Sequence, residues 1–360
     1  MKDVRITRLT ELLLDYSIGI KKGDNLYLEW KGQTALSLIA ELISQTVKRG
    51  ANPLWIYHDE KLLRPLIEGA SIEQMKEYSK AHCELMKRSQ CYIGINGSDN
   101  PFEMASLSLK QSDNFTKYFS KPVHTDIRSG HTRWCVLRWP SVAMAQMAGM
   151  SHQEFIEFYF ETCLVDYKKM SREMDGFTSL MEKTNDVRIV APDTDLTFSI
   201  KGVPVKKCDG HMNIPDGEIF TAPVKNSVNG TIKFNAPALH RGMVFTNIKM
   251  EFKNGRAVKV SCDGDSKALN SILDIDEGAR FIGEFAVGVN PKIKRPMKDG
   301  LFDEKIDGSI HFALGSCYDE VPNGNKSAIH WDLILIQTPE WGGGEIYFDG
   351  KLVRKDGKFT

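Results

Sequence analysis

The strand–helix–strand pattern near the amino terminus constrains the fold of this chain most strongly. Residues 24–30 (DNLYLEW) and 52–58 (NPLWIYH) have the pattern of strands, and residues 34–50 have that of a helix ending at a glycine. Short apolar runs at residues 91–97 and 132–140 add two predicted strands, the second ended by a proline. The pattern predicts an α/β fold whose Rossmann-like amino-terminal domain has a largely parallel, helix-covered sheet.

The pattern changes at Val187. Residues 141–184 are helical in pattern, whereas the runs that follow are short, strand-like and separated by turn residues. We therefore expect two domains, an α/β domain at residues 1–185 and a β-rich α+β domain at residues 186–360.

Hairpin signals characterise the second half. Asn254-Gly255 and Asp349-Gly350 each lie between alternating strand-like runs, which is typical of tight hairpin turns. Residues 265–275 form the one clear helix of this half. The carboxy-terminal domain is therefore expected to be mostly antiparallel.

Composition excludes several classes of function. Lys plus Arg and Asp plus Glu number 47 each, and no basic stripe with interleaved aromatic residues indicates a nucleic-acid partner. No apolar run approaches the roughly 18–20 residues of a membrane span, and the amphipathic start does not have the pattern of a signal peptide. Seven cysteines without a CxxC pair argue against a disulfide framework. These features predict a cytoplasmic protein with reduced thiols.

Metal-binding side chains gather in strand-like runs of the last third. They are Glu218 in PDGEIFTAP, Glu284 in RFIGEFAVGVN, His311 and Tyr318 in SIHFALGSCY, and His330 and Asp332 in SAIHWDLIL. Because strand side chains alternate between faces, His330 and Asp332 project to the same side about 6–7 Å apart. One metal ion, or a close pair, would then bind both.

A purely structural role is the competing interpretation. Glu284 lies in an apolar run, where a carboxylate is costly to bury unless it is paired or binds metal, and a salt bridge would also satisfy it. No other part of the sequence gathers His and acidic residues in this way. The remaining histidines are therefore expected to have surface or core roles: His58, His82, His124, His131, His152, His211 and His240.

The chemistry of the cluster favours hydrolysis. Carboxylates and imidazoles suit zinc, cobalt or manganese and exclude soft thiolate chemistry. Three carboxylates suit two divalent ions with one bridging carboxylate, and such pairs, about 3.5–4 Å apart, activate water and polarise a carbonyl.

These motifs resemble a known family. GEIFTAP, GEFAVGVN, IHFALGSCY, IHWDLIL and the closing GGGEIYFDGKLVRKDGKF resemble the thermophilic-type metalloaminopeptidases (M29), which include aminopeptidases T and S. YSIGIKKGDNLYLEW and FYFETCLVDY extend the resemblance to the amino-terminal half. The resemblance implies a metalloaminopeptidase (a hydrolase and exopeptidase) that acts on short peptides with a free amino terminus. It also implies a homodimer whose active sites face an enclosed cavity.

The resemblance further implies a dinuclear site and its ligands. The matching metal-site residues are Glu218, Glu284, His311, Tyr318, His330 and Asp332. Glu284 is expected to bridge the ions, or one of the carboxylates to take the proton from water, and the phenol of Tyr318 to stabilise the oxyanion or hold a ligand.

Two alternatives remain open from the sequence. Dioxygenases that open dihydroxypyridine rings resemble this fold and bind one iron through two His and one Asp, which His311, His330 and Asp332 would match. Such a site does not require Glu218 and Glu284. The second alternative is a non-catalytic relative that binds metal or peptides without turnover.

Overall fold

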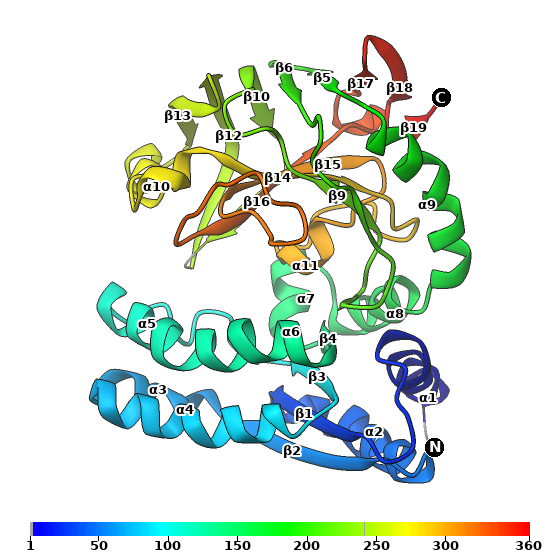
Figure 1. Ribbon diagram of the computed structural model, residues 1–360, viewed down its shortest axis with the longest axis vertical. Helices are drawn as coiled ribbons and strands as arrows, with labels where there is room; N and C mark the ends of the chain where they lie inside the picture. Colours follow the sequence, from blue (N-terminus) through cyan, green and yellow to red (C-terminus); the bar gives the residue numbers. More distant parts are fainter. Residues whose placement is uncertain (1–2, 241) are drawn as a thin grey trace. The chain divides into compact units, whose positions relative to one another are not determined.

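The computed structural model describes residues 3–240 and 242–360 (Figure 1). Contacts divide the chain into two units, unit 1 with Met1–Leu164 and Gly210–Pro215, and unit 2 with Val165–Asp209 and Asp216–Thr360. The sequence places a domain boundary near residue 185, whereas this division precedes the helix Tyr167–Glu182 (α9). The boundary between independently folding domains stays a prediction.

Unit 1 is built on a five-stranded parallel sheet with the order β2-β1-β3-β4-β8. Its strands are β1 (Asn25–Lys31), β2 (Asn52–His58), β3 (Cys91–Asn96), β4 (Arg133–Arg138) and β8 (Asn213–Ile214). The predicted strand–helix–strand unit is confirmed, with α2 (Leu36–Lys48) connecting β1 to β2. Parallel neighbours need such crossovers, so the sheet becomes buried between helices.

Unit 1 contains further helical segments besides α2. They are α1 (Val4–Glu11), η1 (Leu12–Ser17), η2 (Gln33–Ala35), α3 (Glu60–Gly69), α4 (Ile72–Lys87), α5 (Leu109–Phe115), η3 (Thr116–Arg128), α6 (Ser129–His131), α7 (Val142–Ala148) and α8 (His152–Cys163). Helix α4 begins at a capping box in which Ser71 and Gln74 bond each other's backbone N–H. One core cluster joins α4, η3 and the sheet through Met86, Phe119 and Tyr92.

Unit 2 contains two antiparallel sheets. The larger has the order β11-β12-β10-β6-β5-β17-β18-β19, with β13 paired to β12, and the smaller has the order β16-β15-β14-β9-β7. Asn254 and Asp349 adopt positive φ before a glycine, as the predicted β12–β13 and β17–β18 hairpins require. The α/β fold with a β-rich second half is thus confirmed.

The elements of unit 2 have the following bounds: α9 (Tyr167–Glu182), β5 (Asp186–Ala191), β6 (Thr194–Ser199), β7 (Lys206–Cys208), β9 (Glu218–Thr221), β10 (Asn229–Phe234), β11 (Ala238–His240), β12 (Met243–Lys253), β13 (Arg256–Asp263), α10 (Ser266–Leu273), η4 (Glu277–Arg280), β14 (Ile282–Gly288), α11 (Gly300–Asp303), β15 (Ser309–Gly315), β16 (His330–Ile336), η5 (Pro339–Trp341), β17 (Glu345–Phe348), β18 (Lys351–Lys355) and β19 (Lys358–Phe359).

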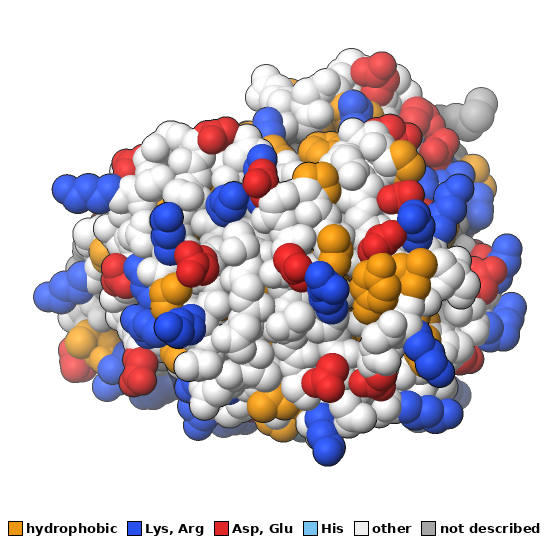
Figure 2. Space-filling view, turned by 90° about the horizontal axis from the view of Figure 1, so that it is seen from above, with side chains coloured by type: hydrophobic (Ala, Val, Ile, Leu, Met, Phe, Trp, Pro, Cys, Tyr) orange, Lys and Arg blue, Asp and Glu red, His pale blue; other side chains and the backbone are white. Residues whose placement is uncertain are grey.

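The surface has mixed charge. Figure 2 views the chain from the top of Figure 1, and on that face Lys and Arg side chains are interspersed with Asp and Glu. Hydrophobic atoms form small, separate patches there. Within the described residues, no helix combines the length and the apolar character that crossing a membrane requires.

Candidate metal centre

The smaller sheet of unit 2 carries the predicted ligands. Glu218 begins β9, Glu284 lies in β14, His311 lies in β15, and His330 and Asp332 lie in β16. We call these residues the five-ligand cluster. The register explains why they meet: directly opposed residues share a face, and Ala313 lies opposite both Glu284 and Asp332. Period-two alternation and the other pairings bring the remaining ligands to that face.

Small residues lie opposite the ligands. The ligands Glu218, Glu284, His311, His330 and Asp332 have Ala or Gly opposite them on a neighbouring strand, at Ala286, Gly288, Ala313 and Gly315. At the two glycines the backbone of another segment approaches closely, because a Cβ would lie 2.4 Å from the Ile306 carbonyl oxygen at Gly288 and 2.1 Å from the Ile329 carbonyl oxygen at Gly315. Side chains larger than Gly are therefore excluded at these two positions.

The ligand atoms form two groups that share Glu284. In the first group, His311 Nε2 lies 3.5 Å from Glu218 Oε2 and 3.4 Å from Glu284 Oε1. In the second group, His330 Nε2 lies 3.3 Å from Glu284 Oε2 and 3.6 Å from Asp332 Oδ1. The two oxygens of Glu284 thus face different groups. This is the arrangement that a carboxylate needs to bridge two ions.

Buried oxygens without partners test whether metal fits the cluster. Among the described residues, Glu218 Oε2 and Asp332 Oδ1 are buried and accept no hydrogen bond. A buried carboxylate oxygen left in this state is costly, and a divalent cation would satisfy both atoms. The hard oxygen and imidazole donors suit zinc, cobalt or manganese. The residues present therefore fit a divalent metal at each group.

Outer contacts orient two of the ligands. His330 Nδ1 lies 2.8 Å from the carbonyl oxygen of Ser316, which can only accept a hydrogen bond. Nδ1 therefore keeps its proton, and Nε2 is the nitrogen that presents a lone pair to the second group once the ring is neutral and binds metal. On the other side, Lys305 Nζ lies 2.6 Å from Glu218 Oε1, which leaves Oε2 facing His311.

Lys305 and its acidic neighbours were missed by sequence reasoning. The Lys305 side chain is fully buried, and its ammonium also lies 2.8 Å from Glu304 Oε2 and 3.9 Å from Asp216 Oδ1. Lys305 lies among acidic residues in LFDEKIDGS, just before the His311 strand, and this is the pattern of a solvated loop rather than of a buried cation. Nothing in its spacing connects it with Glu218, because the two positions are far apart in the chain.

Protonation balances the cluster when metal is absent. Burial would raise the pKa of Glu284, but hydrogen bonds from His311 and His330 overcome this effect and lower it to about 2. Burial would lower the pKa of each imidazole, yet the nearby carboxylates raise that of His311 to about 9 and that of His330 to about 10. Burial raises the pKa of Asp332 to about 7. Without metal, the positive charges of the two protonated imidazoles therefore offset the negative charges of the carboxylates.

Tyr318 lies at the edge of the second group. Its ring is 4.6 Å from the His330 ring and 5.8 Å from that of Phe220, centroid to centroid, and 46% of the residue is exposed. Desolvation and the Glu284 carboxylate raise its pKa well above the ordinary value, so the phenol keeps its proton. Its hydroxyl makes no hydrogen bond with a residue that the structure describes. Its assignment as a metal ligand or oxyanion stabiliser stays a prediction.

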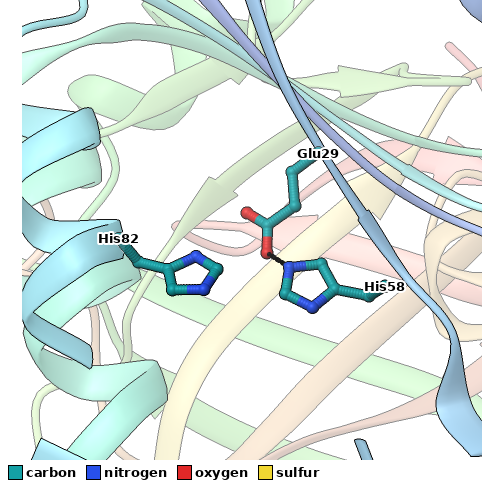
Figure 3. A group of neighbouring side chains, drawn as sticks. All are labelled: Glu29, His58 and His82. Carbon is teal, nitrogen blue, oxygen red and sulfur yellow. Dashed lines mark ion pairs between the residues drawn. The ribbon is translucent and has the colours of Figure 1, made fainter. Parts of the chain in front are cut away.

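The expectation that no other part of the chain gathers His and acidic residues is wrong. Glu29, His58 and His82 of unit 1 place ligand atoms within 4.8 Å of one another (Figure 3). His124 Nε2 lies 3.7 Å from Glu29 Oε2. These side chains come from separate elements, so no local spacing revealed them.

The remaining histidines lie in other settings. His240 packs against Trp331 at 4.6 Å between ring centroids, beside the strand that carries two ligands. His211 stacks on Tyr16 in unit 1. His131 lies at the surface, and His152 lies in α8.

Comparisons with known proteins identify the family of this chain. The sequence profile of the thermophilic metalloprotease (M29) family matches residues 2–359. "Aminopeptidase AmpS" of Bacillus subtilis (strain 168) is 24% identical over 367 residues, which cover 92% of this chain and 88% of that protein.

Two solved structures share the fold over the whole chain. "Wild-type AmpT from Thermus thermophilus" superposes with a TM-score of 0.85 at 21% identity and 100% coverage of both chains. A 2,5-dihydroxypyridine dioxygenase from Pseudomonas putida KT2440 has a TM-score of 0.64 at 13% identity, covering 100% of this chain and 98% of that one. At these identities, each likeness bears on the fold alone.

Proposed function

This chain belongs to the thermophilic metalloprotease (M29) family, and on that premise we propose that the five-ligand cluster is where it removes amino-terminal residues from peptides. The relatives are aminopeptidases, so the chain is a metal-dependent aminopeptidase, a hydrolase of the exopeptidase class. We further propose the number of ions, the residues that hold them and the way in which the substrate binds.

Two divalent ions suit the cluster, and the observation that carries this proposal is the position of Glu284. Its two oxygens face two separate imidazoles, 3.4 Å and 3.3 Å away. Glu218 and His311 would complete one site, and His330 and Asp332 the other. When bound, such ions polarise the scissile carbonyl and lower the pKa of water.

The protein's own groups have distinct tasks in this proposal. Lys305 holds Glu218, and the Ser316 carbonyl holds His330, so both ligands are oriented before metal arrives. The neutral phenol of Tyr318 is a hydrogen-bond donor beside the second group and would stabilise the developing oxyanion. A cluster carboxylate would take the proton from the attacking water.

A free α-amine would restrict cleavage to the first residue of the peptide. In this proposal the neutral α-amine of the peptide would bind one of the two ions, which would place the first peptide bond at the site. Short peptides, a homodimer and a cytoplasmic location also belong to the proposal. Seven free cysteines support a reducing compartment.

The mononuclear iron alternative accounts for fewer of the buried charged residues. It uses His311, His330 and Asp332 but leaves Glu218 and its buried Lys305 partner without a role in the reaction. The complete set of metal-binding side chains argues against a relative that has lost catalysis.

Reconstitution of the metal-depleted protein tests the proposed function. Aminoacyl-amides and their N-acetylated counterparts would be assayed after adding zinc, cobalt or manganese in turn. We expect release of the first residue only with metal and only from substrates with a free amine. Cleavage of the acetylated set at the same rate would exclude amine recognition, and no release from any substrate would exclude the aminopeptidase reaction.

A further inference from the structure

A second group of ligand-type side chains lies at the topological switch point of the unit 1 sheet. Strand β1 lies between β2 and β3, so the connection from β1 to β2 runs one way along the sheet and the connection from β2 to β3 runs back past β1. In open parallel sheets, ligands bind in the crevice that this reversal creates beyond the carboxyl ends of the strands. Glu29 lies near the carboxyl end of β1, and His58 is the last residue of β2.

A cavity lies at the same place. It has a volume of about 200 Å³, and Glu29, His58, Tyr92 and His124 are among its lining residues. The His58 side chain is only 5% exposed, whereas that of His124 is 25% exposed. The cavity therefore borders a buried carboxylate and imidazole together with a more accessible imidazole.

Three side chains point toward a common centre. Figure 3 shows Glu29, His58 and His82 arriving from β1, β2 and α4 with their polar ends facing one another. His58 Nε2 lies 2.6 Å from Glu29 Oε1, an ion-pair contact between two buried side chains. We call Glu29, His58 and His82 the switch-point cluster.

Two tyrosine hydroxyls outside the cluster contact the polar groups of Glu29 and His82. The Tyr92 hydroxyl donates to Glu29 Oε2 at 2.9 Å, and the Tyr27 hydroxyl lies 3.1 Å from His82 Nδ1. Such second contacts fix ring orientation and ligand basicity in metal sites. The His58 and His82 rings are stacked at 5.4 Å between centroids, so neither is free to turn away.

We propose that Glu29, His58 and His82 form a second metal site, separate from the five-ligand cluster, which binds one zinc-class divalent ion. Two imidazoles and one carboxylate are a zinc ligand set that leaves a fourth position open. His124 and the cavity lie beside Glu29. The site does not depend on the proposed catalytic roles.

Metal counting in full-length variants tests this proposal. The variant H311A/H330A removes both imidazoles of the five-ligand cluster and is expected to retain one zinc equivalent after dialysis. Adding E29Q to it, a substitution of nearly equal size, should reduce the count to zero. Adding H131Q, at an exposed histidine of unit 1, should leave one equivalent.

Two results would overturn the proposal. One is H311A/H330A binding no zinc while folded by circular dichroism. The other is H311A/H330A/E29Q retaining its equivalent. Zinc-edge anomalous diffraction from wild-type crystals provides a measurement that does not depend on variants folding: a peak among Glu29, His58 and His82 is expected, and its absence at full zinc loading would refute the site. Failure of the catalytic proposal would instead appear as missing peaks at the five-ligand cluster.

Discussion

The ammonium of Lys305 lies 2.6 Å from Oε1 of Glu218, so a fully buried cation holds one oxygen of the first metal ligand while the other faces His311. This contact connects the stability of unit 2 with its metal affinity. It also explains why a lysine is tolerated in the core: three carboxylates surround it, from Glu218, Glu304 and Asp216.

Substitution of Lys305 by Met should weaken both properties. Breaking a buried ion pair from one side costs about 3–5 kcal/mol, because a buried charge loses its partner. We expect the free energy of unfolding of K305M to fall by this order and zinc to be lost first from the group containing Glu218. Denaturant titration and metal analysis measure the two effects. K267M, at an exposed position on α10, is the control, and equal results for both variants would refute the role of Lys305.

Substitution of Glu284 by Gln should remove the bridge between the two groups. Losing outer partners of metal ligands alone costs about 10–100-fold in affinity or activity, so losing a shared ligand should lower kcat/KM by more than about 100-fold. E251Q changes an exposed strand glutamate of unit 2 and should leave kcat/KM unchanged. An E284Q protein with wild-type activity and metal content would show that Glu284 does not bridge.

Substitution of Tyr318 by Phe separates the oxyanion role from ligation. Removing one oxyanion donor typically lowers kcat by about 10²–10³-fold, and we expect that loss with KM little changed and both metals bound. Loss of a metal ion would instead identify the phenol as a ligand. Y347F, which removes a hydroxyl bonded to Glu345, is the control. Full kcat with both metals bound would eliminate the oxyanion role.

The metal-free protein should become less stable as the pH rises. The folded-state pKa values of His311 and His330 are about 9 and about 10, above the ordinary value of 6.5. Their stabilisation is therefore complete below pH 6.5 and is lost as the pH rises through about 9 and about 10. Unfolding of chelator-treated protein near pH 6.5 and near pH 10 measures this loss. Metal-free H311Q/H330Q should lack this part of the dependence, and an identical pH profile in both proteins would contradict the assignment.

The sequence predicted the elements whose signals are local. The strand, helix and strand at residues 24–58 each have their own periodicity, and the Asn254-Gly255 hairpin has its own turn residues. The candidate ligands were found for the same reason: His330 and Asp332 are two apart in one strand, and charged residues are conspicuous in apolar runs.

The residues that escaped prediction meet only through the fold. Glu29, His58 and His82 come from two strands and a helix whose adjacency depends on the strand order. Lys305 reaches Glu218 because the loop that precedes β15 returns to β9. Neither contact produces a recognisable motif in the sequence. The order of strands in a sheet and the path of a loop depend on packing between distant parts of the chain, not on neighbouring residues.

Anomalous diffraction from zinc-loaded crystals tests the central claim, a two-ion site built on Glu284, most directly. Two peaks are predicted at the smaller sheet of unit 2, one against Glu218, Glu284 and His311 and the other against Glu284, His330 and Asp332. A single peak touching only His311, His330 and Asp332, with Glu218 bound to Lys305 alone, would contradict it.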